Sequence, residues 1–325
     1  MKYGVVYAKT DNIGDDIQAV AALQFLPRVD FWIERENLHK VESDDVVKVI
    51  LNGWFTFNPW SWPPSEAIQP LIISIHISPH VSMYFLRNKV VRYLKRWEPI
   101  GARDLWTLKL LKYGGVNAYF SGCLTLTLDK TYEPHKRSDY ILLVDVPASV
   151  EKAVQRRFKD HVVKWSNRLT TLGRDRVLRS VDSYINRVFN QIFPFSIRYN
   201  LNVLHDYIYY KLFNLKVGAL TPAIRLQTAS EVVKLVASAR AVVTSKLHIA
   251  LPALAFETPL VFIPRDPNDV RFSGYRQFMA HFCPVEKAAK CIREFKPEEY
   301  NIPNRRLLED LKEDMQKRVY SFLET

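Results

Sequence analysis

The segment AVVTSKLHIALPALAFETPLVFI, which runs from Ala241 to Ile263, constrains the fold of this chain more than any other. Its two ends are short apolar runs of the kind that form parallel strands buried on both faces. Between them, a polar turn leads into a helix that is apolar on nearly every side, which is typical of a helix sandwiched within a protein. The segment therefore predicts a βαβ unit and, with it, a parallel sheet.

The polar turn of this unit contains Ser245, Lys246 and His248 and is a candidate anion-binding site. A helix N-terminus presents free N–H groups and a partial positive charge, so it can hold a phosphate or a carboxylate. Lys246 would add a positive charge, and His248 could transfer a proton because histidine titrates near neutral pH. A structural role for His248 inside the turn is the alternative.

The beginning of the chain predicts a similar strand–turn–helix unit. We expect a strand at Tyr3 to Ala8 and a helix at Ile17 to Leu26, with Asn12, Gly14 and Asp15 in the turn between them. These three residues would lie at the carboxyl end of the strand, where α/β sheets bind ligands. The turn is not a dinucleotide-binding fingerprint, because it contains a single glycine. Asp15 could instead only cap the helix.

Strand and helix patterns alternate along the rest of the chain and indicate an α/β protein. We expect further strands at Val46 to Leu51, Leu71 to Ile77 and Tyr140 to Val146, and helices at Val81 to Trp97, Leu105 to Tyr113, Val177 to Phe193, Ser230 to Ala239 and Asn304 to Leu323. The chain has 325 residues, which exceeds the usual size of a single core. We therefore expect two domains, residues 1–133 and 134–303, and a helix at 304–325 that crosses back to the first domain.

Two surface features point to binding partners. Trp54, Trp60 and Trp62 follow one predicted strand, and their rings could stack on a sugar or fill the space under the loop. The formal net charge of +12 indicates an acidic partner, which could be nucleic acid, an anionic membrane or a phosphorylated small molecule. The predicted helix at Val81 to Trp97 mixes basic and apolar side chains, so it could lie on an anionic membrane or form a solvated outer helix.

The cysteines and the hydropathy pattern indicate the compartment. Cys123, Cys283 and Cys291 are odd in number and lack CxxC spacing, so we expect neither a disulfide framework nor a zinc site. A reducing, cytoplasmic setting fits this usage. No apolar stretch approaches the length of a membrane span, and the first residues do not form a signal-peptide pattern.

Several short motifs occur in an order that resembles the polysaccharide pyruvyl transferase family. They are the N-x-G-D turn at Asn12 to Asp15, ARD at Ala102 to Asp104, FSGCLTLTL at Phe120 to Leu128, the block at Ala241 to Ile263 and D-x-R-F-x-G at Asp269 to Gly274. The resemblance spans nearly the whole chain except Glu151 to Asp206. One departure is Lys246, since the family usually carries arginine there in an S-R-L-H pattern, and the two cations are not interchangeable at a bidentate site.

This resemblance implies two Rossmann-like domains that face each other across a cleft, as in glycosyltransferases of the B type. The first domain would bind the acceptor, and the second would bind the donor. The implied reaction transfers pyruvate from phosphoenolpyruvate to a pair of sugar hydroxyls and forms a cyclic ketal in a cell-surface or extracellular polysaccharide. Phosphoenolpyruvate is then a co-substrate, and no cofactor or metal is expected.

Such a reaction needs cations for the donor, a proton donor and a base. The expected donor-binding residues are Lys246, Ser245, Arg103 and Arg271. The expected catalytic residues are His248 as general acid and Asp15 or Asp104 as base, with His205 as a further candidate acid. The expected acceptor-binding residues are Asn12, Gly14, Trp54 and Trp60. Arg103 and Asp104 could instead form a simple ion pair.

Two other functions remain open at this point. The same architecture serves glycosyltransferases that use a nucleotide sugar, because fold does not fix function. The chain could also be a catalytically idle protein that binds a glycan or an anionic surface. The expected partners are phosphoenolpyruvate and a glycan or lipid-linked saccharide, with peripheral contact at the inner face of an anionic membrane. Nucleic acid is the least favoured partner.

Overall fold

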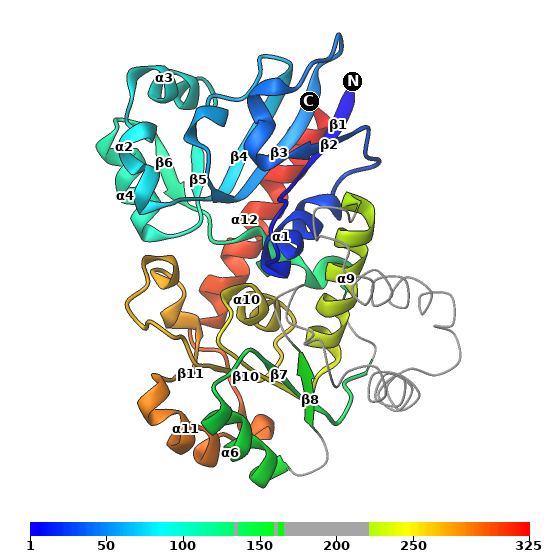
Figure 1. Cartoon of the computed structure of the whole chain (residues 1–325), viewed down its shortest axis with the longest axis vertical. Helices are drawn as coiled ribbons and strands as arrows, with labels where there is room; N and C mark the ends of the chain where they lie inside the picture. The colour runs from blue at the N-terminus through cyan, green and yellow to red at the C-terminus, as the bar shows by residue number, and fades with distance from the viewer. Residues whose placement is uncertain (133–135, 159–161, 166–220) are drawn as a thin grey trace.

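A computed structural model describes residues 1–132, 136–158, 162–165 and 221–325. The described chain forms two halves, each built around a parallel sheet, and the halves are stacked along the long axis of the molecule (Figure 1). The helix expected at Val177 to Phe193 and the candidate acid His205 lie outside the described residues.

The first half contains a six-stranded sheet in the order β2-β1-β3-β4-β5-β6. Its strands are β1 (Lys2–Tyr7), β2 (Phe31–Glu34), β3 (Val47–Phe55), β4 (Ile68–Ile77), β5 (Ile100–Ala102) and β6 (Ala118–Phe120). Its helices are α1 (Ile13–Leu23), α2 (Ser82–Phe85), α3 (Asn88–Arg96), α4 (Leu105–Tyr113) and α5 (Asp129–Tyr132). Short 3-10 helices lie at η1 (Arg35–Lys40), η2 (Pro59–Ser61), η3 (Pro79–Val81) and η4 (Leu124–Thr127).

The second half contains a five-stranded sheet in the order β11-β10-β9-β7-β8. Its strands are β7 (Ile141–Val144), β8 (Val162–Trp165), β9 (Ala241–Thr244), β10 (Leu260–Phe262) and β11 (His281–Phe282). Its helices are α6 (Ala148–Phe158), α9 (Pro222–Ser238), α10 (Leu247–Ala255) and α11 (Ala288–Glu294), and α12 (Arg305–Glu324) ends the chain. The remaining 3-10 helices are η7 (Val270–Phe272), η8 (Arg276–Phe278), η9 (Val285–Lys287) and η10 (Pro297–Glu299).

The predicted fold class, an α/β protein with two Rossmann-like halves, is confirmed. Every strand pairing in both sheets is parallel. The predicted βαβ unit is present as β9, α10 and β10, and its two strands are direct neighbours with Val243 beside Val261. The carboxyl ends of the two sheets face each other, because the turns that follow β1 and β5 meet the turn that follows β9.

Buried apolar side chains form a core that is shared by the two halves. One cluster joins Ile17 and Val20 of α1 to Val236 of α9, Ile249 of α10 and Met315 of α12. Two further clusters cover the other faces of the sheets, one under α2, α3 and α4 and the other under α6 and α11. The two halves are therefore packed against each other by hydrophobic burial, which is the main source of stability in such cores.

The C-terminal helix α12 runs from the second half back to the first (Figure 1). Lys48 of β3 binds its last turn, because the Nζ of Lys48 donates to the carbonyl oxygen of Phe322 at 2.7 Å. A cation at a helix C-terminus satisfies free carbonyls and complements the helix dipole. Burial lowers the pKa of Lys48.

The structure corrects three predicted helices. The helix expected at Ser230 to Ala239 is the second half of α9, which begins at Pro222 after the Thr221 side chain caps it. Helix α1 begins at Ile13 rather than Ile17, because the Asn12 side chain caps it by accepting from the backbone N–H of Gly14 at 3.1 Å. The helix expected at Val81 to Trp97 is broken into α2 and α3, since Arg87 has an extended backbone at the start of α3.

The expectation of no disulfide is wrong. Cys283 and Cys291 are bonded, with their Cα atoms 6.5 Å apart. Cys283 follows β11 and Cys291 lies in α11, so the short connection through η9 folds the two residues against each other. The cysteines therefore do not support the expected reducing compartment, because a bonded pair such as Cys283 and Cys291 persists in oxidising environments. Cys123 is free and buried.

Candidate active site

Two helix N-termini from different halves meet at the centre of the molecule. The turn before α1 approaches the start of α10 so closely that a Cβ on Gly14 would lie 3.1 Å from both Cβ and Nδ1 of His248. The absence of a side chain at Gly14 permits this approach. Because both helices direct their N-termini to this region, it has a positive potential before any side chain is added.

Arg103 lies in the same region, between β5 and α4, and is fully buried. Its Nη1 donates to Oε1 of Gln18 at 2.7 Å and lies 3.4 Å from Nε2 of His248. Its Nε and Nη2 are buried without a hydrogen-bond partner among the described residues, and Nε is 3.9 Å from a carboxylate oxygen of Asp104. Unpaired buried donors are costly, and a guanidinium binds carboxylate and phosphate through such donors. Arg103 is thus suited to hold an anion.

His248 is neutral in this arrangement, since burial and the positive charges of Arg103 and Arg271 lower its pKa well below the usual value. An arginine can only donate, so the contact with Arg103 requires an unprotonated Nε2 and leaves the proton on Nδ1. The expectation that His248 titrates near neutrality is wrong for the free protein. An anion beside the ring would raise its pKa.

Lys246 and Ser245 occupy the turn before α10, as predicted. The Nζ of Lys246 lies 3.5 Å from a carboxylate oxygen of Asp145, which directly follows β7. The hydroxyl of Ser245 donates to the backbone carbonyl of Asp145 at 2.7 Å. Thr244 accepts from the backbone N–H of Lys246 at 3.0 Å and fixes the turn. Sequence reasoning missed Asp145, because it falls inside the strand predicted at Tyr140 to Val146, whereas the observed strand ends at Val144.

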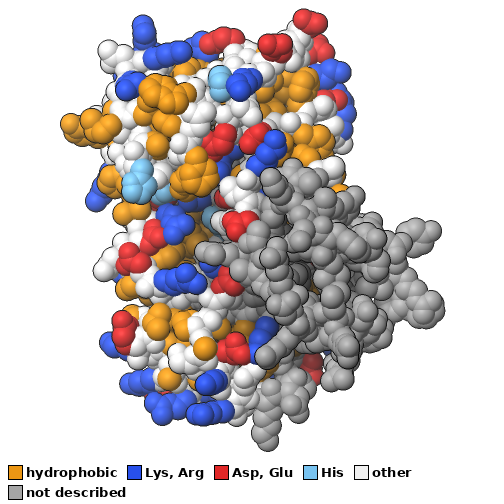
Figure 2. Space-filling view, viewed as in Figure 1, with side chains coloured by type: hydrophobic (Ala, Val, Ile, Leu, Met, Phe, Trp, Pro, Cys, Tyr) orange, Lys and Arg blue, Asp and Glu red, His pale blue; other side chains and the backbone are white. Residues whose placement is uncertain are grey.

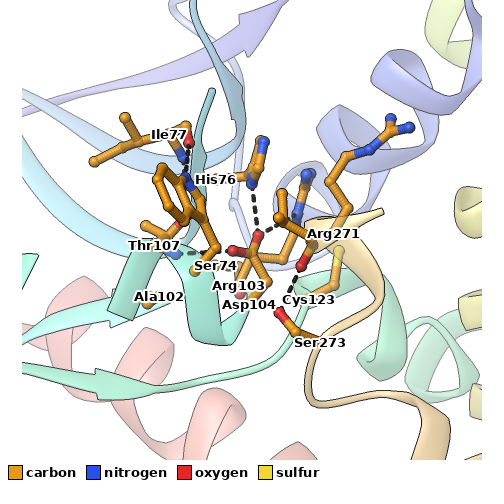
Figure 3. Close-up of polar contacts among 12 residues, drawn as sticks. Ser74, His76, Ile77, Ala102, Arg103, Asp104, Thr107, Cys123, Arg271 and Ser273 are labelled. Atoms are coloured by element: carbon orange, nitrogen blue, oxygen red, sulfur yellow. Dashed lines mark hydrogen bonds and ion pairs between the residues drawn. The ribbon is translucent and has the colours of Figure 1, made fainter. Parts of the chain in front are cut away.

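Asp104 and His76 form a buried pair beside Arg103 (Figure 3). One oxygen of Asp104 accepts from the backbone N–H of Thr107 at 2.9 Å and caps α4. The other oxygen bonds Nδ1 of His76 at 2.6 Å. Both oxygens of Asp104 are therefore engaged, which suits a residue that orients His76 better than one that takes a proton itself.

His76 was missed by sequence reasoning because it stands within an apolar strand. With Nδ1 bonded to the carboxylate of Asp104, the ring carries its proton there and leaves Nε2 as an acceptor. No described residue forms a hydrogen bond with this Nε2. Burial lowers the pKa of His76, while the bond to Asp104 raises it. The ring is therefore neutral near pH 7 and able to accept a proton.

Arg271 lies on the loop that joins the second half to this pair (Figure 3). Its guanidinium is bonded to Asp269, with Nη2 at 2.5 Å from Oδ2, and this contact raises its pKa. The loop is anchored on the first half, because Tyr275 donates to the carbonyl of Arg103 at 2.5 Å and Ser273 accepts from the N–H of Leu105 at 3.1 Å. These contacts account for the D-x-R-F-x-G motif and place Arg271 near Asp104 and Asp15.

Asp15 lies in a hollow of the first half, beside Gln18, Arg35, Asn52 and Trp54. It accepts from the hydroxyl of Thr10 at 2.7 Å, and its other oxygen is 3.5 Å from Nη1 of Arg35. The guanidinium of Arg35 also stacks on the ring of Trp54 at 4.9 Å. Gln18 lines this hollow and accepts a hydrogen bond from Arg103 through its Oε1.

Two of the three predicted tryptophans lie away from this hollow. Trp60 is 64% exposed and packs edge-on against Tyr84. Trp62 is buried between Phe55 and Phe85 and fills the core under the loop. The structure thus brings together Asn12, Gly14, Asp15, Arg103, Asp104, His248 and Arg271. Ser245 and Lys246 lie in the turn before His248, Trp54 lies at the adjoining hollow, and Trp60 lies outside.

A buried ion pair holds α1 against α9 beside the site. Arg225 of α9 donates to both oxygens of Asp16, at 3.0 and 2.9 Å, and to the carbonyl of Thr10 at 2.6 Å. Burial raises the pKa of Asp16 to about 7, although Arg225 opposes this shift. In the described part of the chain, no group of His, Cys, Asp and Glu side chains has the geometry to hold a metal ion.

The fold and site define a two-domain α/β protein with buried cationic side chains where its halves meet. The model of the polysaccharide pyruvyl transferase family matches residues 12–267, and the chain belongs to this family. The family indicates a transferase that moves a pyruvyl group to a polysaccharide. A search of curated proteins finds no match.

Solved structures with a similar chain path are distant in sequence. One is a functionally uncharacterized protein from Klebsiella pneumoniae, with 13% identity, a TM-score of 0.44 and coverage of 83% of this chain and 87% of that one. Another is the UDP-GlcNAc 2-epimerase of Methanocaldococcus jannaschii, with 13% identity, a TM-score of 0.36 and coverage of 98% and 100%. The wall teichoic acid polymerase TagF has 10% identity, a TM-score of 0.36 and coverage of 100% and 90%.

Proposed function

We propose that this protein transfers pyruvate from phosphoenolpyruvate to two hydroxyls of a sugar and forms a cyclic ketal in a cell-surface or extracellular polysaccharide or its lipid-linked precursor. Family membership supports pyruvyl transfer. The observation that carries the choice of donor is Arg103, a buried guanidinium with two unpaired nitrogens next to the N-terminus of α10. Phosphoenolpyruvate offers both a carboxylate and a phosphate to such a pocket.

The proposed reaction is balanced without a cofactor. A proton adds to the methylene carbon of phosphoenolpyruvate, and one sugar hydroxyl attacks the central carbon and gives its proton to a base. The bond between that carbon and the phosphate oxygen then breaks. The second hydroxyl attacks the same carbon, and its proton leaves with phosphate. The products are the ketal and inorganic phosphate.

The donor is held at the start of α10 in this proposal. Arg103 binds one anionic group through its unpaired nitrogens, and Lys246, with the free N–H groups of α10, binds the other. Lysine serves here as a point charge rather than a bidentate partner, which is sufficient for a phosphate. Arg271 contributes positive potential while it remains bonded to Asp269.

Two histidines share the proton transfers. His248 is the general acid, because an anionic donor beside it raises its pKa and supplies the protonated form that the free protein lacks. His76 is the general base, since its Nε2 is free to accept while Asp104 holds Nδ1. This is the arrangement in which a carboxylate fixes the tautomer of a catalytic histidine. Asp15, with Trp54, serves the acceptor side.

The test is product analysis with phosphoenolpyruvate and a panel of aryl hexosides. We expect release of inorganic phosphate that depends on the hexoside, with a pyruvyl ketal on the sugar detected by mass spectrometry. Nucleotide sugars are the control donors, and their turnover with no reaction of phosphoenolpyruvate would replace this proposal with a glycosyltransferase.

A further inference from the structure

Three large apolar side chains are exposed on the surface of the first half. Phe57, Trp60 and Met83 are 70%, 64% and 76% exposed. They lie on the loop after β3, on η2 and on α2. Single exposed apolar side chains are common, but a group of them rimmed by polar residues marks a surface for another molecule or a membrane. We call these three residues the apolar ridge.

The apolar ridge is connected to the acceptor hollow at one end. The ring of Phe57 contacts that of Trp54 at 4.4 Å, and Trp54 lines the hollow that contains Asp15. At the other end, Trp60 contacts the ring of Tyr84 at 5.1 Å, next to Met83 in α2. The ridge therefore runs from the edge of the hollow to the outside of the molecule.

Basic side chains border the apolar ridge. Five of them follow Met83, namely Arg87, Lys89, Arg92, Lys95 and Arg96, and no acidic residue occurs between Ala67 and Trp97. Helix α3 buries Val90 and Leu94 against the sheet, so it turns its basic face outward. Figure 2 shows apolar side chains at the left edge of the upper half, with Lys and Arg side chains beside them.

The chemistry of this surface fits a bilayer better than a nucleic acid. Aromatic side chains, with basic groups around them, settle at the headgroup level of anionic membranes. A single-stranded nucleic acid would instead need an open aromatic face for stacking. One face of Trp60 is covered by the guanidinium of Arg87 at 5.4 Å, the ring of Phe57 packs against Trp54 and under the guanidinium of Arg35, and Met83 offers no ring.

We propose that the apolar ridge and the basic face of α3 dock the protein on an anionic membrane surface. Phe57, Trp60 and Met83 enter the headgroup layer, and Arg87, Lys89 and Arg92 bind the acidic lipids. Docking places the hollow at Trp54 next to the bilayer, where a lipid-linked saccharide would reach it. The docking itself does not depend on the identity of the donor.

Co-sedimentation with vesicles tests this inference. The wild type should bind vesicles of phosphatidylcholine with phosphatidylglycerol and not vesicles of phosphatidylcholine alone. The Arg87→Gln/Arg92→Gln variant should bind the anionic vesicles roughly 30-fold more weakly, because each basic residue near an anionic surface contributes about 1 kcal/mol, or about fivefold in affinity. Trp60→Ser/Met83→Ser should lose binding at high salt, where only the apolar contact remains.

Lys290→Gln/Arg305→Gln is the matched control, because it removes two exposed charges from α11 and the start of α12. It should bind like the wild type, and all variants should keep the wild-type melting temperature. Equal loss in the control, or binding to heparin without any binding to vesicles, would overturn the inference. If phosphoenolpyruvate were not a substrate, the vesicle result would still stand, so the two proposals fail separately.

Discussion

Gly14 sets the distance between the two halves at the position of His248. Alanine there would press its Cβ against His248 at 3.1 Å and against Asn12 Oδ1 at the same distance. We expect Gly14→Ala to shift the imidazole of His248 and slow pyruvyl transfer by about 10- to 100-fold, because a small displacement of a reacting group lowers the reaction rate steeply. Steady-state kinetics would measure this effect.

Gly114→Ala is the control for Gly14→Ala. It lies at the end of α4, and its Cβ would lie 3.0 Å from the flexible side chain of Leu86 and at ordinary contact distance, 3.4 and 3.7 Å, from the backbone oxygens of Leu111 and Leu110. It should leave turnover unchanged. Full activity of Gly14→Ala would show that His248 does not need its present position.

The pair of His76 and Asp104 predicts a pH dependence. The base must be neutral, and burial lowers the pKa of His76 below its usual value, so the acid limb of the kcat profile should lie below the usual histidine range, while loss of the His248 proton sets the alkaline limb. Asp104→Asn removes the carboxylate that raises this pKa, so the acid limb should move to lower pH while the plateau drops by about 100-fold or more.

Asparagine caps helices as well as aspartate does, so Asp104→Asn should keep the cap of α4 and the stability of the fold. Thermal melting checks this point. A plateau equal to that of the wild type would remove His76 from the chemistry and return the role of base to Asp15.

Only part of the site could be predicted at the level of single residues. Residues in turns after strands, such as Arg103 and His248, were predictable because α/β sheets bind ligands there. His76 and Gln18 were not, because a polar residue inside a strand or helix shows its partner only after folding. The pKa of His248 depends on Arg103, which is far from it in sequence.

At the scale of elements, the contact of α1 with α9 depends on the pair of Asp16 and Arg225. Asp16→Asn leaves Arg225 buried without its charge partner and should lower the free energy of unfolding by about 3–5 kcal/mol. Asp16→Asn/Arg225→Met should cost less than the two single changes together, because neither charge then remains buried. Urea unfolding measures all three.

The free energy of unfolding of Arg225→Met should depend on pH differently from that of the wild type. The pKa of Asp16 is already raised above that of the unfolded chain, and loss of Arg225 raises it further. The folded state of the variant then holds this proton up to a higher pH. The stability that the protonated carboxyl contributes is fully present below the unfolded pKa near 3.8 and is lost as pH rises through the folded pKa, which lies above about 7 in the variant. A constant difference from the wild type between about pH 6 and 8 would contradict this sign.

The order of the elements was largely predictable from sequence, and their interruptions were not. Short apolar runs gave β1, β3, β4 and β9 because parallel strands are buried on both faces. Nothing in the residues around Arg87 marks the break between α2 and α3, since neither Gly nor Pro occurs there. Strand β2 lies at the edge of its sheet, where only Ile33 of its three apolar residues is buried, so it does not show the pattern of a strand buried on both faces.

At the scale of the whole molecule, α12 ties the second half to the first. Lys48→Met removes the cation that binds the carbonyl of Phe322 and should lower the free energy of unfolding by about 1.5–3 kcal/mol, the range for a hydrogen bond to a charged group. Lys317→Met, at an exposed position of the same helix, should be neutral. Equal stability of Lys48→Met and the wild type would show that apolar packing alone holds the end of α12.

The proposed donor site at the start of α10 is tested most directly by calorimetric titration of phosphoenolpyruvate into the wild type, Lys246→Ala and His248→Ala. The wild type should bind the donor. Lys246→Ala should weaken binding by about 10- to 100-fold, since a charge-assisted contact contributes about 1.5–3 kcal/mol. His248→Ala should bind within about threefold of the wild type and be slow only in turnover. Binding of a nucleotide diphosphate but not of phosphoenolpyruvate, or equal loss of donor binding in both variants, would contradict the proposed site.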